Sequence, residues 1–77
     1  MDDRLTRIFS DVFDIDAALI TPDASPDTID DWDSLSHINM VLAIEGEFGI
    51  KFTMTEVAQL TRYDKIMALI TEHGGDV

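Results

Sequence analysis

The chain has 77 residues, and its 5 Lys+Arg against 16 Asp+Glu give a formal net charge of −11 at pH 7. It contains no cysteine, which excludes disulfide frameworks, zinc knuckles, iron–sulfur sites and thiol catalysis. An acidic chain is repelled by phosphate backbones and anionic lipid, so nucleic acids and membrane surfaces are poor partners and basic protein surfaces are favoured. The length predicts a single domain over residues 1–77, and 45% hydrophobic residues predict that it folds.

The sequence also predicts where the protein resides. Its first residues, Met1-Asp2-Asp3-Arg4, lack the basic start and apolar run of a signal peptide. No apolar stretch approaches the roughly 20 residues that a membrane-spanning helix needs. We therefore expect a cytoplasmic protein without membrane insertion.

A first helix is predicted just after the N-terminus. Its apolar residues recur at i, i+3, i+4, i+7 and i+8, the spacing of one helical stripe: Leu5, Ile8, Phe9, Val12 and Phe13. Asp2 and Asp3 stand at its start, where carboxylates interact favourably with the helix dipole. One side of this helix should therefore face a core.

A long acidic connection follows, from Asp14 to Asp33, with two prolines and seven aspartates. Loops of this length inside compact domains are usually functional or disordered. A helical turn is expected near Asp16–Leu19. The residues expected to hold the loop on the core are its large aliphatic ones: Ile15, Leu19, Ile20 and Ile29.

A second helix is predicted from Ser34 to Phe48. Asp33 or Ser34 can cap its start, and Gly49 suits the left-handed conformation that ends helices. Apolar residues cover more than half of its circumference: Leu35, Ile38, Met40, Val41, Leu42, Ile44 and Phe48. Such a helix either lies at the centre of a bundle or offers part of its apolar surface to a ligand or partner.

Two further helices complete the predicted fold. Thr53 and Glu56 have the spacing of a capping box, which begins a short third helix. Thr61 is expected to cap a fourth helix that Gly74-Gly75 ends, with Asp76-Val77 frayed. The sequence thus predicts an all-α, small four-helix bundle, with three main helices, one short helix and a long loop between the first two. The apolar stripe of the fourth helix is Tyr63, Ile66, Met67 and Ile70.

Enzyme and metal motifs are absent from the sequence. There is no glycine-rich phosphate loop and no Gly-x-Ser-x-Gly elbow. Ser34 and His37 are the only local nucleophile–base pair, and Asp33 could not readily orient the histidine while capping the helix. No register of residues 14–33 offers the glycine and glutamate of an EF-hand loop. We therefore predict no catalytic residues and no metal site.

Asp33-Ser34-Leu35 carries the remaining chemistry. Ser34 follows a long loop and opens a helix, where backbone N–H groups and the dipole favour an attached phosphate. The alternative is that Ser34 only caps the helix, which is the commoner role of such serines.

From Asp33 to Ile70 the chain resembles the acyl carrier proteins. In that family Asp-Ser-Leu opens the second helix, and the serine carries 4′-phosphopantetheine. The continuation here matches the family's "VMALEEEFGI"-like segment without a gap, and its residues are Val41, Leu42, Ala43, Ile44, Glu45, Gly46, Glu47, Phe48, Gly49 and Ile50. The third and fourth helices and the acidic loop also agree in position, so the resemblance covers nearly the whole chain.

The resemblance implies a carrier rather than an enzyme. A phosphopantetheinyl transferase would move the arm from coenzyme A to Ser34, and the arm's thiol would hold an acyl group as a thioester. The implied partners are that transferase and the acyl-loading and acyl-processing enzymes with basic docking patches, which a monomeric carrier visits in turn. The expected partner-binding residues are Asp33, Leu35, Ser36, Ile38, Asn39, Leu42, Glu45, Phe52, Glu56 and Val57. Leu42, Phe52, Val57 and Leu60 either line a groove for the acyl chain or belong to the core.

The sequence departs from fatty-acid-synthesis carriers at several positions. Ser36, Asn39 and Gly46 stand where those carriers usually bear acids, so weaker docking to fatty-acid-synthase enzymes is expected. Trp32 replaces a small residue and is expected to pack the loop on the bundle, while His37 is interpreted as an ordinary exposed histidine. These departures favour a specialised, free-standing carrier in a polyketide, modified-acyl or lipid-related pathway. The alternatives are an aminoacyl or peptidyl carrier and a non-enzymatic acidic interaction module.

Overall fold

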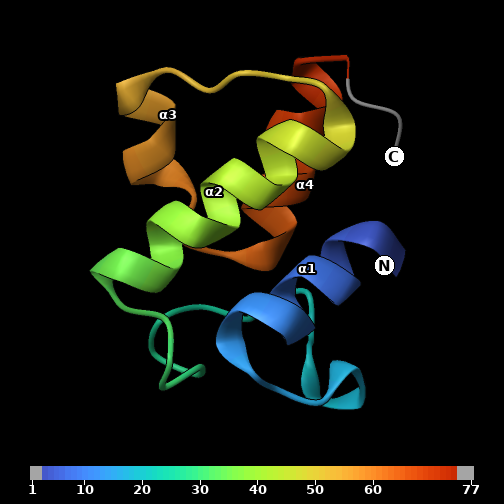
Figure 1. Ribbon diagram of the computed structural model, residues 1–77, viewed down its shortest axis with the longest axis vertical. Coiled ribbons are helices and arrows are strands. Elements are labelled where there is room, and N and C mark those ends of the chain that lie inside the picture. The colour runs from blue at the N-terminus through green and yellow to red at the C-terminus, as the bar shows by residue number, and fades with distance from the viewer. Residues whose placement is uncertain (1–2, 75–77) are drawn as a thin grey trace.

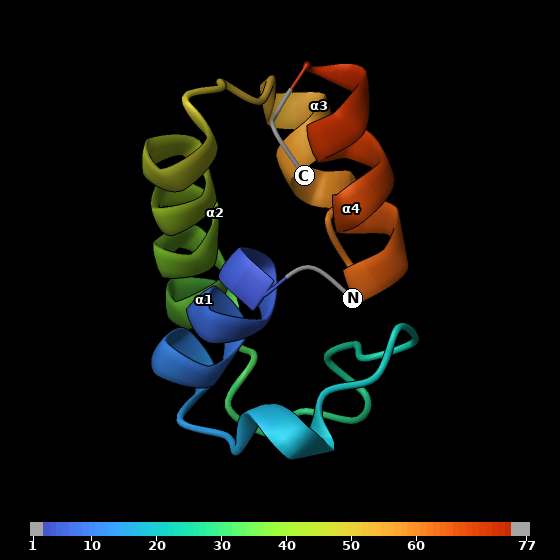
Figure 2. The ribbon, with the colours of Figure 1, turned by 90° about the vertical axis from the view of Figure 1, so that its right-hand side faces the viewer.

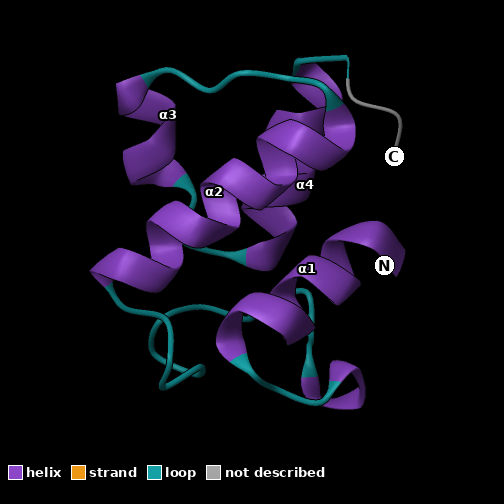
Figure 3. Cartoon of the chain, viewed as in Figure 1, coloured by secondary structure: helices purple, strands orange, loops and turns teal. Residues whose placement is uncertain are grey.

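The computed structural model describes residues 3–74, which contain helices and no strand (Figure 1, Figure 3). The elements are α1 (Asp3–Phe13), the single 3-10 turn η1 (Ala17–Leu19), α2 (Ser34–Phe48), α3 (Met54–Gln59) and α4 (Tyr63–Glu72). The predicted all-α bundle of three main helices and one short helix is confirmed. The long loop between α1 and α2 crosses the end of the bundle at which α2 begins (Figure 1, Figure 2).

Helix α1 is amphipathic, as its periodicity predicts. Leu5, Phe9 and Phe13 are buried, while Ile8 and Val12 pack against the core from its margin. Arg4 places its guanidinium 4.4 Å from the centroid of the Phe48 ring, which attracts the cation to the ring face at the far end of α2. Helix α1 therefore packs against one side of α2.

Helix α2 begins and ends at the predicted residues. Asp33 accepts a hydrogen bond of 2.9 Å from the Ser36 N–H, and Gly49 adopts a left-handed φ of 67° and donates to the Glu45 carbonyl. One side of the helix buries Met40, Val41, Ile44 and Phe48 in the core. The opposite side leaves Leu35, Ile38 and Leu42 exposed, so the helix is both central to the bundle and apolar toward solvent.

The loop from residue 14 to residue 33 is ordered on the core. Asp16 caps η1 by accepting from the Ala18 N–H, and Ile20 and Ile29 are buried as expected. The expectation for Leu19 was wrong, because its side chain is 68% exposed. Ile20 has extended backbone and turns inward, so its neighbour Leu19 points to the other side of the chain.

Helix α4 begins differently from the prediction. Thr61 does not cap it: the N-cap residue is Arg62, whose side chain makes no capping bond and instead pairs with Asp64 at 3.0 Å. The first amides of α4 are satisfied by the loop, since Tyr63 donates to the Ala24 carbonyl and Asp64 to the Pro22 carbonyl. Gly74 follows the end of α4 with a φ of 78°, whereas Gly75, Asp76 and Val77 lie outside the described residues.

An aromatic cluster joins the loop to α1 and α4. The Phe9 ring lies edge-on to the rings of Phe13, Trp32 and Tyr63 at centroid distances of 5.0–5.4 Å. Trp32 also stacks on Phe13 at 4.9 Å and is only 6% exposed, which confirms that it packs the loop on the bundle. The Tyr63 hydroxyl lies 2.8 Å from the Thr6 hydroxyl oxygen, so the same cluster carries a polar tie between α1 and α4.

Gly46 in α2 and Gly49 at its C-cap test the end of this helix, because alanine should change stability in opposite directions at the two positions. We expect Gly49→Ala to lower the free energy of unfolding by about 1–2 kcal/mol, because a Cβ is strained at positive φ. Gly46→Ala is the matched control: no atom lies within 4 Å of the added Cβ, and alanine in a helix interior raises stability by about 0.5–1 kcal/mol. Urea unfolding followed by circular dichroism measures both changes. A stability loss in both variants, or in neither, contradicts this assignment of the cap.

Candidate functional site

Ser34 is the first residue of α2 and is exposed to solvent. The cap of the helix is Asp33, so the alternative in which Ser34 serves as that cap does not hold in the structure. Within residues 3–74, the Ser34 hydroxyl makes no hydrogen bond. The side chain is thus accessible at a helix N-terminus, the end of a helix that favours an anionic group.

Asp33 is an electrostatic part of this helix start. The hydrogen bond from the Ser36 backbone N–H is the main cause that holds the pKa of Asp33 below its usual range. Its main-chain carbonyl accepts from the His37 N–H at 2.8 Å, so the first turn of α2 is fixed through both groups of the same residue. Asp33, expected to bind partners, therefore has a structural role that its exposure does not reveal.

A shallow groove runs from Ser34 between α2 and α3. Its lining combines the loop, the first turns of α2 and the end of α3: Pro26, Trp32, Asp33, Ser34, His37, Ile38, Ala58 and Thr61. The groove is open to solvent along its length. A group attached to Ser34 could lie in it without any displacement of the core.

His37 departs from its expected role. The interpretation as an ordinary exposed histidine was wrong, because the side chain is half-buried and both ring nitrogens are engaged. The Trp32 indole N–H donates to Nδ1 at 2.9 Å, and Nε2 lies 2.8 Å from the Val57 carbonyl oxygen. Trp32 and His37 are five residues apart in the sequence, on either side of the start of α2. This short spacing was the only local signal that the two side chains are in contact.

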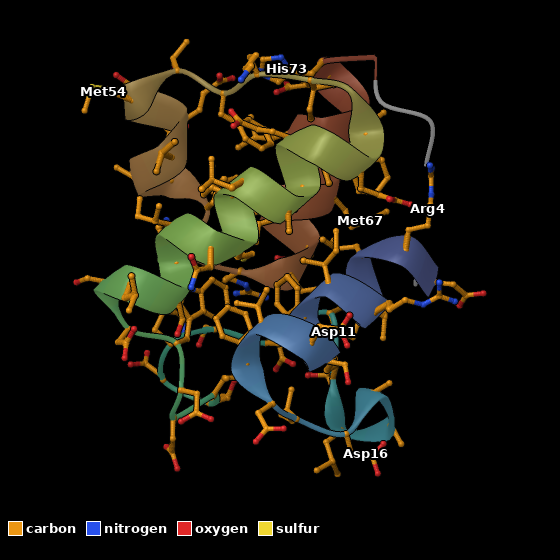
Figure 4. All side chains as sticks on the ribbon, in the orientation of Figure 1. Arg4, Asp11, Asp16, Met54, Met67 and His73 are labelled. Atoms are coloured by element: carbon orange, nitrogen blue, oxygen red, sulfur yellow. The ribbon has the colours of Figure 1, made fainter. Side chains whose placement is uncertain are left out.

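The expected partner-binding residues fall into two groups. Leu35, Ile38 and Leu42 lie on one exposed face of α2, with Ser36 and Asn39 on the same helix. Met54, at the start of α3, was not anticipated; it is 91% exposed and projects from the bundle (Figure 4). Exposed apolar side chains therefore occur on α3 as well as on α2.

The two glutamates of the expected set make structural hydrogen bonds. Glu45 accepts from the Phe52 backbone N–H at 2.9 Å, which ties the end of α2 to the α2–α3 connection. Glu56 completes the predicted capping box with Thr53 and also lies 2.8 Å from His73 Nε2. The hydrogen bond from the Thr53 backbone N–H is the main cause that lowers the pKa of Glu56, with the His73 bond second.

The four candidate acyl-groove residues do not share one environment. Leu60 is fully buried in the core, Phe52 and Val57 pack against it from the margin, and Leu42 is on the surface. None of the four lines the groove beside Ser34. The structure thus assigns Leu60 to the core and Leu42 to the exposed face of α2.

Two further searches concern residues 3–74 alone. No three His, Cys, Asp or Glu side chains among them come together in a way that could hold a metal ion. None of their helices has both the length and the apolar content to cross a membrane.

The Asp33 cap has a pH dependence of defined sign. Because its pKa is lowered by folding, its stabilising contribution is complete above the ordinary carboxyl pKa of about 4 and is lost as pH falls through the lowered value. We expect Asp33→Ala to unfold at lower urea concentration than the wild type at neutral pH, and this difference to shrink on acidification. Asp33→Asn is the control, since its side-chain oxygen accepts the Ser36 N–H without titrating. A difference between wild type and Asp33→Ala that stays constant down to about pH 2 would show that the carboxylate does not act as the cap.

Known proteins are similar to this chain in sequence. Residues 3–70 match the family described as "Phosphopantetheine attachment site". The polyketide-8 synthase acyl carrier protein 2 of Streptomyces avermitilis is 30% identical over 74 residues, which are 96% of this chain and 85% of that protein. Acyl carrier protein AcpXL of Rhizobium etli is 38% identical over 66 residues, 83% of this chain and 70% of its own length.

A solved structure agrees with the fold. The solution NMR structure of a holo acyl carrier protein from Geobacter metallireducens superposes with a TM-score of 0.81 at 38% sequence identity, covering 92% of this chain and 82% of that one. The chain therefore belongs to the acyl carrier protein family, whose members hold acyl groups on a covalently attached 4′-phosphopantetheine.

Proposed function

We propose that Ser34 is the attachment residue and that residues 1–77 form one monomeric, cytoplasmic carrier domain. The observation that carries the assignment concerns the start of α2. Asp33 caps the helix, so the Ser34 hydroxyl is not needed as a cap and is exposed. The groove that begins at Ser34 supports it further, because it gives an attached arm a surface to lie on.

Ser34 acts in this proposal as a substrate and a tether. The Ser34 hydroxyl oxygen forms a bond to the phosphorus atom that carries pantetheine in coenzyme A. The bond between this phosphorus and the nucleotide half of coenzyme A breaks, so the nucleotide half departs and the hydroxyl proton is lost. The attached arm supplies a terminal thiol, which the cysteine-free chain lacks and which holds an acyl group as a thioester. Tethering raises the local concentration of that acyl group at each docked enzyme, so the carrier needs no catalytic residue of its own.

The surface around Ser34 supports a specialised pathway. Ser36, Asn39 and Gly46 leave α2 without acids at positions where fatty-acid-synthesis carriers usually bear them, while Leu35 and Leu42 are exposed. The Streptomyces relative is named for a polyketide synthase. We propose acyl transfer in a polyketide, modified-acyl or lipid-related pathway, with a phosphopantetheinyl transferase and acyl-loading and acyl-processing enzymes as partners.

The attachment residue can be tested by intact mass. Incubation with coenzyme A and a broad-specificity phosphopantetheinyl transferase should add one phosphopantetheine to the wild type and none to Ser34→Ala. Ser36→Ala is the matched control, because it removes a serine from the same helical turn and should still be modified. Modification of Ser34→Ala, or of no folded variant, refutes the assignment. Loading of the modified protein with malonyl, fatty-acyl and aminoacyl donors then distinguishes acyl from aminoacyl carriers, and we expect the acyl donors to react.

The missing acids can be restored to test pathway specificity. We expect the malonyl form of Ser36→Glu/Asn39→Glu to lower the KM of a fatty-acid ketosynthase by about threefold to tenfold, as two exposed ion pairs of up to about 1 kcal/mol each allow. Ala68→Glu/Thr71→Glu makes the same charge change at exposed positions of α4 and should leave KM unchanged. The proposed specialisation is contradicted if the KM of this ketosynthase is the same for the wild-type malonyl form as for that of a fatty-acid carrier.

A further inference from the structure

Three polar groups form a continuous bridge beside Ser34. Trp32 lies in the loop, His37 in the first turns of α2 and Val57 in α3, and His37 contacts both of the others. The Trp32 and His37 rings are nearly parallel, with an interplanar angle of 20° and centroids 6.2 Å apart. Contacts across three elements therefore converge on a single imidazole.

The chemistry of the partners determines the protonation of His37. The Trp32 indole N–H is only a donor, so Nδ1 must present its lone pair. The Val57 carbonyl is only an acceptor, so Nε2 must carry the hydrogen. The bridge thus requires the neutral imidazole, in the tautomer protonated at Nε2. A second proton would place an N–H on Nδ1 opposite the indole N–H, and two donors cannot bond each other.

Helix α3 depends on such contacts more than the other helices do. It has six residues and none of them is buried, whereas α1, α2 and α4 each bury at least three. At its start, Glu56 bonds His73 from the end of α4, and near its end the Val57 carbonyl bonds His37. A short helix with little apolar burial opens at low cost once a polar tie is lost.

We propose that His37 is a proton-controlled latch between Trp32 and α3. In its neutral form it joins the loop, α2 and α3 along the groove that begins at Ser34. Protonation at Nδ1 breaks the bond to Trp32, while the Nε2–H still donates to the Val57 carbonyl. Helices α2 and α3 therefore stay joined, and the loop is released from them on the side of the groove.

The groups around His37 give the latch a defined electrostatic setting. From the loop it faces the Trp32 indole and from α3 the Val57 carbonyl, and Asp33, at the start of α2, lines the same groove. Of the residues that line the groove, Asp33 and His37 alone are ionisable in the unmodified chain. A proton on Nδ1 therefore competes directly with the hydrogen bond from Trp32, and Asp33 is the one acidic side chain that lines the same groove.

The chain offers clean reporters for a test. It contains one tryptophan and two histidines, so a His73→Gln background leaves His37 as the sole titrating imidazole. In this background we would follow the Trp32 indole N–H resonance and the protection factors of the Val57 and Leu60 amides from about pH 8 to about pH 5. His37→Gln keeps an acceptor and a donor without titrating, and His37→Phe keeps a ring without either.

We expect the Trp32 indole resonance to move upfield with the midpoint of the His37 ring protons. The two protection factors should change by less than about twofold across the same midpoint, because the protonated ring still donates from Nε2 to the Val57 carbonyl. His37→Gln should keep the high-pH indole resonance throughout, and a folded His37→Phe should show the low-pH indole resonance throughout. An indole resonance that stays still while His37 titrates overturns the latch, as does an unchanged pH step in His37→Gln. None of these readouts requires modification of Ser34, so they stand apart from the test of the attachment residue.

Discussion

The burial of Trp32 is the constraint on which the position of Ser34 depends. The indole is enclosed by Phe9 and Phe13, and two residues later Ser34 is exposed. Asp33, between them, turns the chain from the core into a helix by accepting the Ser36 N–H. Trp32 is fixed in the core, and Asp33 caps the helix at the next residue. These two constraints leave Ser34 little freedom of position, although a twenty-residue loop precedes it.

The loop is stabilised by backbone hydrogen bonds to α4 as well as by the burial of Trp32. Its carbonyls at Pro22 and Ala24 accept the first amides of α4, which would otherwise need a side-chain cap or water. Each segment thus completes the hydrogen bonding of the other, and Ile20 and Ile29 bury apolar surface beneath them. The acidic side chains remain outside, as Asp16 does at the end of the molecule where the loop lies (Figure 4). The loop can therefore carry much of the negative charge without burying any of it.

Local chemistry made much of the fold predictable. The bounds of α2 follow from Asp33 and Gly49, and the start of α3 follows from the Thr53–Glu56 capping box, because these signals act within four residues. The start of α4 was mispredicted, since its amides bond carbonyls about forty residues earlier in the chain, at Pro22 and Ala24. His37 was misjudged for the same reason: one partner, Val57, lies twenty residues away. Pattern reasoning thus located Ser34 and its helix but not the contacts between segments that surround them.

The distribution of burial separates a rigid side of the site from a compliant one. Ser34 belongs to α2, which buries Met40, Val41, Ile44 and Phe48, so the proposed attachment residue is part of a helix that is anchored in the core. The opposite wall of the groove is the end of α3, which has no buried residue and is tied by single hydrogen bonds. A carrier has to present its arm in a constant position and still accommodate different partners and cargoes. Because the energetic cost of rearrangement is low only at α3, the fold allows the groove to change on that side while Ser34 stays in place.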